Sequence, residues 1–284
     1  MPRVSVLMPT YNTRPEYLRE AVDSVLAQTF KDFELIILDD ASTECNVEEV
    51  IRSYSDPRIR FEQNERNLGI SESRNKLMDM ARGEYLAVLD HDDVSLPERL
   101  ARQVEYLDAH PEVGVLGTAF VHIPKNRMAK SYPLENDQIV AHLMLTGMAV
   151  SHSSSMLRKS VIDAYDIKYQ AIYSPAEDYA LCCSCIGKTR FANLPEVLFH
   201  YRSYDTNTSA LKQKEMHDAA VQIRYITRRG NPSLWFAVQA DATTLIRHKL
   251  FGIPFLVTKK HNNLTEHLLF GKIPVLRSRS KTFV

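Results

Sequence analysis

Apolar residues along the first 110 positions alternate between two kinds of spacing. Short runs of branched apolar residues are typical of buried strands, whereas apolar residues that recur every three or four positions form one face of a helix. Strands are expected at 4–8, 34–38, 58–62 and 85–89, and helices over 18–26, 46–54, 70–82 and 100–107. This alternation predicts an α/β fold with a parallel sheet and helices on both faces.

The second half of the chain has a more mixed pattern. Strands are expected at 113–121, 150–157, 190–194 and 197–201, and helices at 137–145 and 177–186. From about residue 209 we expect a helical extension. Residues 241–284 hold eight Lys or Arg against two acidic residues, interleaved with apolar side chains. This tail either lies on an anionic membrane surface or packs on the main domain or on a second subunit, which would make a homo-oligomer.

Charge and cysteine content limit the partners and the compartment. The formal net charge of +0 gives no reason to expect nucleic acid as a partner. Four cysteines do not make a disulfide framework in 284 residues, which favours a reducing cytoplasm. We expect no signal segment at the N-terminus, and the apolar stretch 250–257 is too short to span a bilayer.

An acidic cluster follows the strand at 85–89: Asp90, His91, Asp92 and Asp93. Three neighbouring carboxylates repel one another unless a cation lies among them. Ligands of open α/β sheets bind just beyond the carboxyl ends of the strands, where such a cluster suits Mg²⁺ or Mn²⁺ shared with a ligand's phosphates. The alternative is a solvated acidic turn.

Other polar segments follow neighbouring strands. They are 9–12, with the sequence Pro-Thr-Tyr-Asn, and 39–43, which begins with two Asp. A carboxylate such as Asp40 at the end of a second strand can bind a base or a ribose, although a turn Asp is the simpler interpretation if it stood alone. The segment 67–75 offers a cation, Arg74, near the same edge.

Taken in order, these segments and the cluster at 90–93 resemble the motifs of family 2 glycosyltransferases over roughly residues 3–209. These are inverting enzymes of the GT-A fold, a Rossmann-like mixed sheet flanked by helices. The resemblance implies a catalytic domain at 1–208, with a nucleotide-sugar half at 1–95 and an acceptor half at 96–208, followed by the extension 209–284. The partners it implies are a nucleotide-sugar donor and a glycan or lipid-linked glycan acceptor.

The resemblance also implies roles for single residues. In the donor site, Asp40 would bind the base, Tyr11 would pack against it beside Pro9, and Asp90 would lie on the ribose side. Asp92 would hold Mn²⁺ or Mg²⁺, and Asp178 in the Glu177-Asp178 pair would be the catalytic base. Arg74 and Arg202 would lie near the base or the diphosphate.

One position departs from the family pattern. The family often places a His three residues after the Tyr that matches Tyr201, and here Tyr204 stands there. Because tyrosine is a poor ligand for Mg²⁺ or Mn²⁺, a third protein ligand would have to come from Asp205 or His200. His152 is expected either in the acceptor pocket or in the core.

These inferences predict a cytoplasmic, metal-dependent, inverting glycosyltransferase, peripheral to the membrane if the basic tail binds lipid. The donor would be a UDP-sugar, and the acceptor a growing surface polysaccharide or a lipid-linked oligosaccharide. Two alternatives remain. A non-catalytic sugar-nucleotide-binding subunit is favoured only by Tyr204, and a sugar nucleotidyltransferase would need a Gly-rich loop that residues 9–12 lack.

Overall fold

The computed structural model describes residues 1–128, 132–204, 207 and 211–239, and the backbone of 256–261, 264–269 and 273–279. The chain divides into two compact units, Met1–Thr227 and Arg228–Val284. The first unit contains a nine-stranded sheet. Its strands are β1 (Val4–Thr10), β2 (Phe33–Asp39), β3 (Ile59–Gln63), β4 (Tyr85–Val88), β5 (Val94–Ser95), β6 (Val113–Ile123), β7 (Arg127–Met128), β8 (Met156–Arg158) and β9 (Arg190–Arg202).

The sheet is parallel in its first half and mixed in its second. The strand order is β3-β2-β1-β4-β8-β6-β9-β5, with β7 beside β6. β1 to β4 pair in parallel, whereas β8 runs antiparallel to β4 and β6, and β5 runs antiparallel to β9. The parallel arrangement predicted for the first 110 residues is therefore confirmed.

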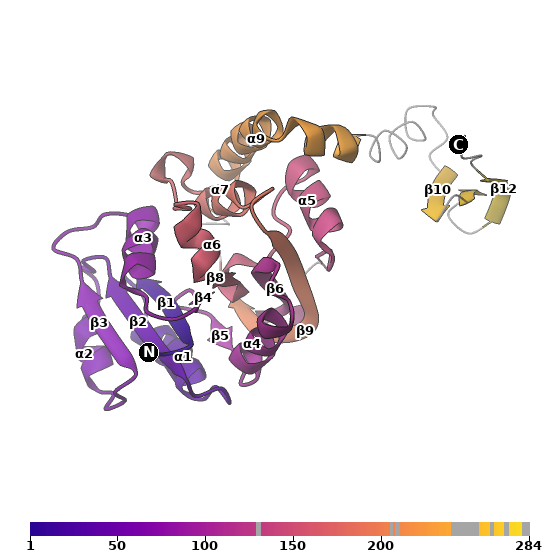
Figure 1. Ribbon diagram of the computed structural model, residues 1–284. Coiled ribbons are helices and arrows are strands. Elements are labelled where there is room, and N and C mark those ends of the chain that lie inside the picture. Colours follow the sequence, from indigo (N-terminus) through magenta and orange to yellow (C-terminus); the bar gives the residue numbers. More distant parts are fainter. Residues whose placement is uncertain are drawn as a thin grey trace. The chain divides into compact units, whose positions relative to one another are not determined.

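Helices cover both faces of this sheet (Figure 1). Alternate residues of β1, such as Val4 and Val6, share a buried cluster with Leu18 of α1 and Leu100 of α4. The crossover from β3 to β4 runs in the opposite direction along the sheet, so α3 packs on the other face. The helices are α1 (Pro15–Leu26), α2 (Val47–Arg52), α3 (Ile70–Met80), α4 (Arg99–Ala109), α5 (Asn136–Leu145), α6 (Lys159–Ala164), α7 (Glu177–Ser184) and α9 (Gln213–Gly230), with short 3₁₀ turns η1 (His152–Ser154) and η2 (Ala171–Tyr173).

The strand predicted at 150–157 is wrong over most of its length. Only 156–158 forms a strand, and 152–154 forms the turn η1. The hydroxyls of Ser154 and Ser155 donate to the carbonyls of Ser151 and His152. Such local bonds compete with strand pairing, which explains the turn. The strands predicted at 190–194 and 197–201 are one strand, β9, whose pairing with β6 shifts register opposite Thr118 and Ala119.

The C-terminal extension is helical only in its first part. Helices occupy 213–230 and 232–239, but 256–279 contains an antiparallel sheet of β10 (Leu256–His261), β11 (Leu264–Leu269) and β12 (Ile273–Arg279). The expectation of helix rested on composition, which does not distinguish a helical from an extended period. The segments are separated by Asn262-Asn263 and Gly271, which are turn-forming residue types.

The predicted membrane contact of 241–284 involves residues 240–255 and side chains that lie outside the described residues. In the part that is described, no helix combines the length and apolarity needed to cross a bilayer.

Candidate active site

The carboxyl ends of β1, β2 and β4 meet at one edge of the sheet. The register pairs Thr10 with Asp39 across β1 and β2, and the amide of Leu89 after β4 donates to the carbonyl of Leu7 at 3.1 Å. A cavity of about 690 Å³ opens at this edge. Its lining includes all the predicted site residues except Arg202, namely Pro9, Tyr11, Asp40, Arg74, Asp90, Asp92, Glu177 and Asp178.

Asp40 connects the end of β2 to the segment before α3. One carboxylate oxygen accepts hydrogen bonds from Asn64 Nδ2 at 2.7 Å and from the Leu68 amide at 2.8 Å, and the other accepts from the Gly69 amide at 2.8 Å. Gly69 has a φ of 87°, a conformation that glycine adopts without strain. Asp40 therefore shapes this wall of the cavity, and its predicted contact with a base stays a prediction.

Asn12 joins the loops that follow β1 and β2. Its side-chain oxygen accepts hydrogen bonds from the backbone amides of Thr43 and Glu44 at 2.8 and 3.0 Å. The backbone amide of Asn12 donates to the hydroxyl of Ser42. Asn12 has a φ of 48°, which asparagine tolerates better than most residues. The neighbouring Tyr11 is left 44% exposed at the cavity, available to a flat ligand group.

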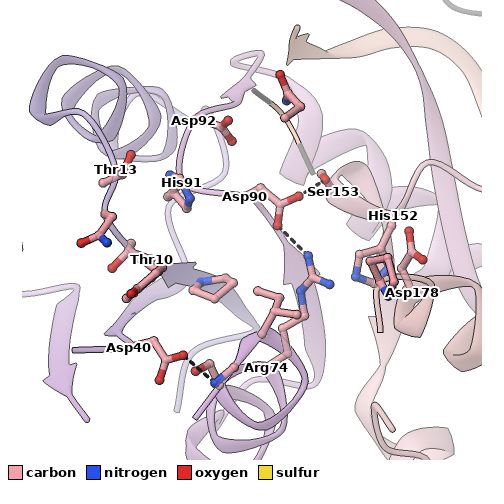
Figure 2. Close-up of a pocket in the computed structure, with 18 of the residues that line it drawn as sticks. Thr10, Thr13, Asp40, Arg74, Asp90, His91, Asp92, His152, Ser153 and Asp178 are labelled. Carbon is pink, nitrogen blue, oxygen red and sulfur yellow. Dashed lines mark hydrogen bonds and ion pairs between the residues drawn. The ribbon is translucent and has the colours of Figure 1, made fainter. Parts of the chain in front are cut away.

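Arg74 of α3 bridges two carboxylates that are far apart in the sequence (Figure 2). Its Nη2 lies 2.9 Å from Asp90 Oδ1, and its Nη1 lies 2.9 Å from Glu177 Oε1. Burial alone would raise the pKa of Asp90, but Arg74 and a hydrogen bond from Ser153 lower it to about 2. Arg74 is 8% exposed, so it joins Asp90 to the start of α7 inside the protein.

Asp178 follows Glu177 at the start of α7 and lines the cavity on the side of His152 (Figure 2). Burial and the adjacent Glu177 raise its pKa to about 6, although Arg74 opposes the shift. One oxygen accepts a hydrogen bond from the Tyr179 amide at 2.6 Å. Asp178 is therefore a carboxylate that changes its protonation close to neutral pH, as a general base does.

His152 lines the same wall and is neutral. Its Nε2 lies 3.0 Å from the hydroxyl of Tyr169, and burial together with Arg74 lowers its pKa to about 3. The guanidinium of Arg74 also lies over the Tyr169 ring, 5.5 Å from its centroid. The sequence allowed two positions for His152, the acceptor pocket or the core. The structure places it in the lining, buried and with its Nδ1 without a hydrogen-bond partner.

Asp92 faces the cavity beneath the end of β9. Its Oδ2 accepts a hydrogen bond from the hydroxyl of Tyr204 at 2.6 Å, and its backbone carbonyl accepts one from Arg202 Nε at 2.7 Å. The rest of the Arg202 guanidinium contacts Glu20 and lies 4.3 Å from the centroid of the Tyr17 ring. Arg202 thus supports the acidic cluster from outside the cavity, and its predicted contact with the donor stays a prediction.

The comparisons with known proteins agree with this geometry. The model of the family described as "Glycosyl transferase family 2" matches residues 5–166. The chain belongs to glycosyltransferase family 2. An uncharacterized glycosyltransferase of Methanocaldococcus jannaschii is 34% identical over 225 residues, which cover 76% of this chain and 77% of that protein. A UDP-Glc:alpha-D-GlcNAc-diphosphoundecaprenol beta-1,3-glucosyltransferase of Escherichia coli is 27% identical over 219 residues, covering 76% of this chain and 83% of the relative.

Solved structures share the GT-A fold of this glycosyltransferase. S. aureus TarS 1–349 in complex with UDP-GlcNAc superposes with a TM-score of 0.63 at 20% identity, covering 78% of this chain and 65% of that one. A mannosyltransferase from Pyrobaculum calidifontis, in complex with GDP-Man and Mn²⁺, superposes with a TM-score of 0.59 at 17% identity and covers 86% of this chain and 75% of that one. At these identities the likeness establishes the fold alone.

The residues of the acidic cluster fit a cation held jointly with a ligand. Asp90 is paired with Arg74, and burial beside Asp92 and Asp90 raises the pKa of Asp93 well above its usual range. Within the described residues, no three His, Cys, Asp or Glu side chains form a metal site by themselves. His200 does not line the cavity, and Asp205 lies outside the described residues. The predicted role of Asp92 as the ligand of Mg²⁺ or Mn²⁺ would then require the other ligands to come from phosphates and water, as Mg²⁺ commonly takes them, and it stays a prediction.

Several residues of the site have no sequence signal. Ser153 donates a hydrogen bond to Asp90. The backbone amide of Tyr169 donates one to Asn75 Oδ1, and the Tyr169 hydroxyl is hydrogen-bonded to His152. None of them belongs to a motif with fixed spacing. The Ser-rich run around 153, where a strand was expected, is the one signal that could have indicated an irregular segment there.

Proposed function

We propose that this glycosyltransferase moves a hexose or N-acetylhexosamine from a UDP-sugar to a hydroxyl of a surface polysaccharide or a lipid-linked oligosaccharide, with inversion. The observation that carries the proposal is that Asp92, after β4, and Asp178, on α7, line the same cavity. A carboxylate for the donor side and a carboxylate for the acceptor side are the two groups that an inverting transfer needs.

The donor end of the cavity suits a nucleoside diphosphate. Tyr11 offers a half-exposed ring beside Pro9, and Asp40 fixes the backbone on the opposite wall. The E. coli relative is named for UDP-Glc, and the S. aureus TarS structure is a complex with UDP-GlcNAc, which supports a UDP-sugar for this chain as well.

Asp92 would hold Mn²⁺ or Mg²⁺ against the diphosphate. When bound, the cation would neutralise the negative charge that grows on the leaving diphosphate. Asp90, whose charge is already balanced by Arg74, would accept hydrogen bonds from the ribose or the sugar. The mannosyltransferase complex with Mn²⁺ supports a metal in this fold.

Asp178 would take the proton from the acceptor hydroxyl as that oxygen attacks the anomeric carbon. Its pKa of about 6 leaves it ionised at neutral pH yet basic enough to accept a proton, a balance worth roughly 10²–10⁴-fold in rate. Neutral His152 beside it adds no competing charge and can hydrogen-bond the acceptor. An attack from the face opposite the leaving group gives a β-linkage from an α-linked donor.

The acceptor is proposed from a relative and from composition. The E. coli relative is named for a diphosphoundecaprenol-linked acceptor. The eight basic residues of 241–284 would suit an anionic lipid surface, so a lipid-linked acceptor is the preferred candidate. A cytoplasmic location, on the side where such a peripheral enzyme would meet nucleotide-sugars, completes the proposal.

Thermal stabilisation by nucleotide-sugars tests donor and metal together. A UDP-sugar at a hundred times its Kd stabilises a protein by about 2.7 kcal/mol, or roughly 5–10 °C in Tm for a domain of this size. We expect this shift with Mn²⁺ present and expect Asp92→Asn to remove it. The control is Asp32→Asn, which changes an exposed carboxylate far from the cavity. A full Mn²⁺-dependent shift in Asp92→Asn would exclude Asp92 as the metal ligand.

The pH dependence of turnover should report Asp178. Because the base must be ionised, kcat is expected to rise about tenfold per pH unit below pH 6 and to level off above it. The raised pKa has the opposite effect on folding: the unfolded chain loses this proton first, so the contribution of Asp178 to stability falls as pH rises from about 4 to 6. A pH–rate profile that is flat between pH 5 and 7 would contradict the assignment.

A further inference from the structure

Tyr204 stands at the position where the family often has a metal-binding His. Its hydroxyl is hydrogen-bonded to a carboxylate oxygen of Asp92. The hydroxyl donates this hydrogen bond to Asp92 Oδ2 over a donor–acceptor distance of 2.6 Å. Asp92 is 8% exposed. One of the two carboxylate oxygens of Asp92 is therefore already engaged by the protein.

Hydrogen bonds to Asn207 hold Tyr204 in place. Its amide donates to Asn207 Oδ1 at 2.6 Å, and Asn207 Nδ2 donates to the carbonyl of Arg202 at 3.1 Å. The Arg202 amide in turn donates to Asp93 Oδ1 at 2.7 Å. These bonds join the end of β9 to the acidic cluster and hold the phenol against Asp92.

The ring of Tyr204 nevertheless remains accessible. It is 36% exposed and its centroid lies 6.1 Å from that of Tyr17, and both tyrosines line the cavity. A small rotation would move the hydroxyl from Asp92 into the cavity, where diphosphate oxygens would accept its hydrogen bond. Phosphate oxygens are charged acceptors, so the exchange would replace one charge-assisted bond by another.

We infer that Tyr204 couples metal binding to donor binding. This inference rests on the proposed role of Asp92. Without a nucleotide, a cation competes with the phenol for the charge of Asp92, and a cation that takes Oδ2 leaves the hydroxyl without a charged partner. With the diphosphate present, the phenol has a new acceptor, so the cation and the donor enter together. Tyr204 is thus a positioning residue that lowers the affinity of the protein for the cation alone, so that tight binding of the cation requires the nucleotide.

Mn²⁺ binding to the full chain tests this coupling, measured by the loss of the free Mn²⁺ signal in electron paramagnetic resonance. In the wild type we expect weak binding of Mn²⁺ alone and much tighter binding with UDP. Tyr204→Phe should raise the affinity for Mn²⁺ alone by roughly tenfold or more, because no hydrogen bond to a charged group must be broken. The factor by which UDP improves Mn²⁺ affinity should fall by a similar amount, and by linkage so should the effect of Mn²⁺ on UDP.

Two control variants separate the inference from the proposal beneath it. Tyr165→Phe removes a half-exposed hydroxyl outside the cavity and should leave both affinities unchanged. Asp92→Asn should abolish Mn²⁺ binding with or without UDP. If Tyr204→Phe leaves the affinity for Mn²⁺ alone unchanged or lowers it, while Asp92→Asn abolishes binding, the coupling role is wrong and Asp92 remains the ligand. If Asp92→Asn binds Mn²⁺ normally with UDP, the metal role of Asp92 fails and the inference fails with it.

Discussion

Replacing Asp178 by Asn is expected to lower kcat at least about a hundredfold while leaving the affinity for the UDP-sugar unchanged. The amide keeps the size of the carboxylate but cannot accept the proton of the acceptor hydroxyl. Because Asp178 lies on α7 and away from the Asp40 end of the cavity, the donor contacts should be preserved (Figure 2). Steady-state turnover and donor titration on the same preparation measure the two quantities.

A matched variant shows whether the loss is specific. Asp166→Asn makes the same chemical change at a side chain that is 82% exposed, and it should retain wild-type turnover. The fall of kcat below about pH 6 should disappear in Asp178→Asn and persist in Asp166→Asn. Turnover within a few fold of wild type in Asp178→Asn would remove Asp178 as the base.

Replacing Arg74 by Met is expected to destabilise the protein by roughly 3–5 kcal/mol, because it leaves the buried Glu177 and the partly buried Asp90 without their cation. Arg74 contacts both Asp90 and Glu177 at 2.9 Å. Urea unfolding measures the free energy. Where the variant is folded, the pKa of Asp178 should also rise, since Arg74 lowers it, and the acid limb of the rate profile should move upward.

Two further substitutions show whether the destabilisation by Arg74→Met comes from the loss of the buried bridge. Arg52→Met breaks an exposed pair with Glu48 and should cost less than about 1 kcal/mol. Arg74→Lys keeps the charge but lacks the planar fork that reaches two carboxylates at once, so its stability should lie between those of wild type and Arg74→Met. If Arg74→Met unfolds with the free energy of the wild type, the bridge does not stabilise the fold.

The strands and the edge that carries the donor site could be predicted from the sequence. Buried strands have a strong apolar signal, and parallel strands place their carboxyl ends together, which brought Pro9, Asp40 and Asp90 to one cavity. The family resemblance then placed Asp92 and Asp178 in the same site. Each of these inferences needed only local pattern and order along the chain.

The partners of these residues could not be predicted in the same way. Arg74 and Glu177 are 103 positions apart, and His152 and Tyr169 meet through a turn where a strand was expected. Contacts of this kind depend on how the two halves of the sheet pack, which no local period encodes. The strands at 256–279 were missed for a different reason, because a basic and apolar composition fits either period.

The structure also changes the interpretation of the acidic cluster. Its three carboxylates have different partners: Asp90 is balanced by Arg74, burial beside the other two carboxylates raises the pKa of Asp93, and Asp92 accepts a hydrogen bond from Tyr204. Of the three, Asp92 is therefore the residue that we propose as the metal ligand.

The release of UDP from UDP-sugars, followed with Mn²⁺ and a diphosphoundecaprenol-linked GlcNAc acceptor, tests the central claim most directly. We predict acceptor-dependent release by the wild type that is lost on metal chelation and in Asp92→Asn, and reduced at least a hundredfold in Asp178→Asn. Binding of UDP-sugars with Mn²⁺ but without hydrolysis or transfer across a panel of such donors and acceptors would contradict it. That result would instead identify a sugar-nucleotide-binding subunit.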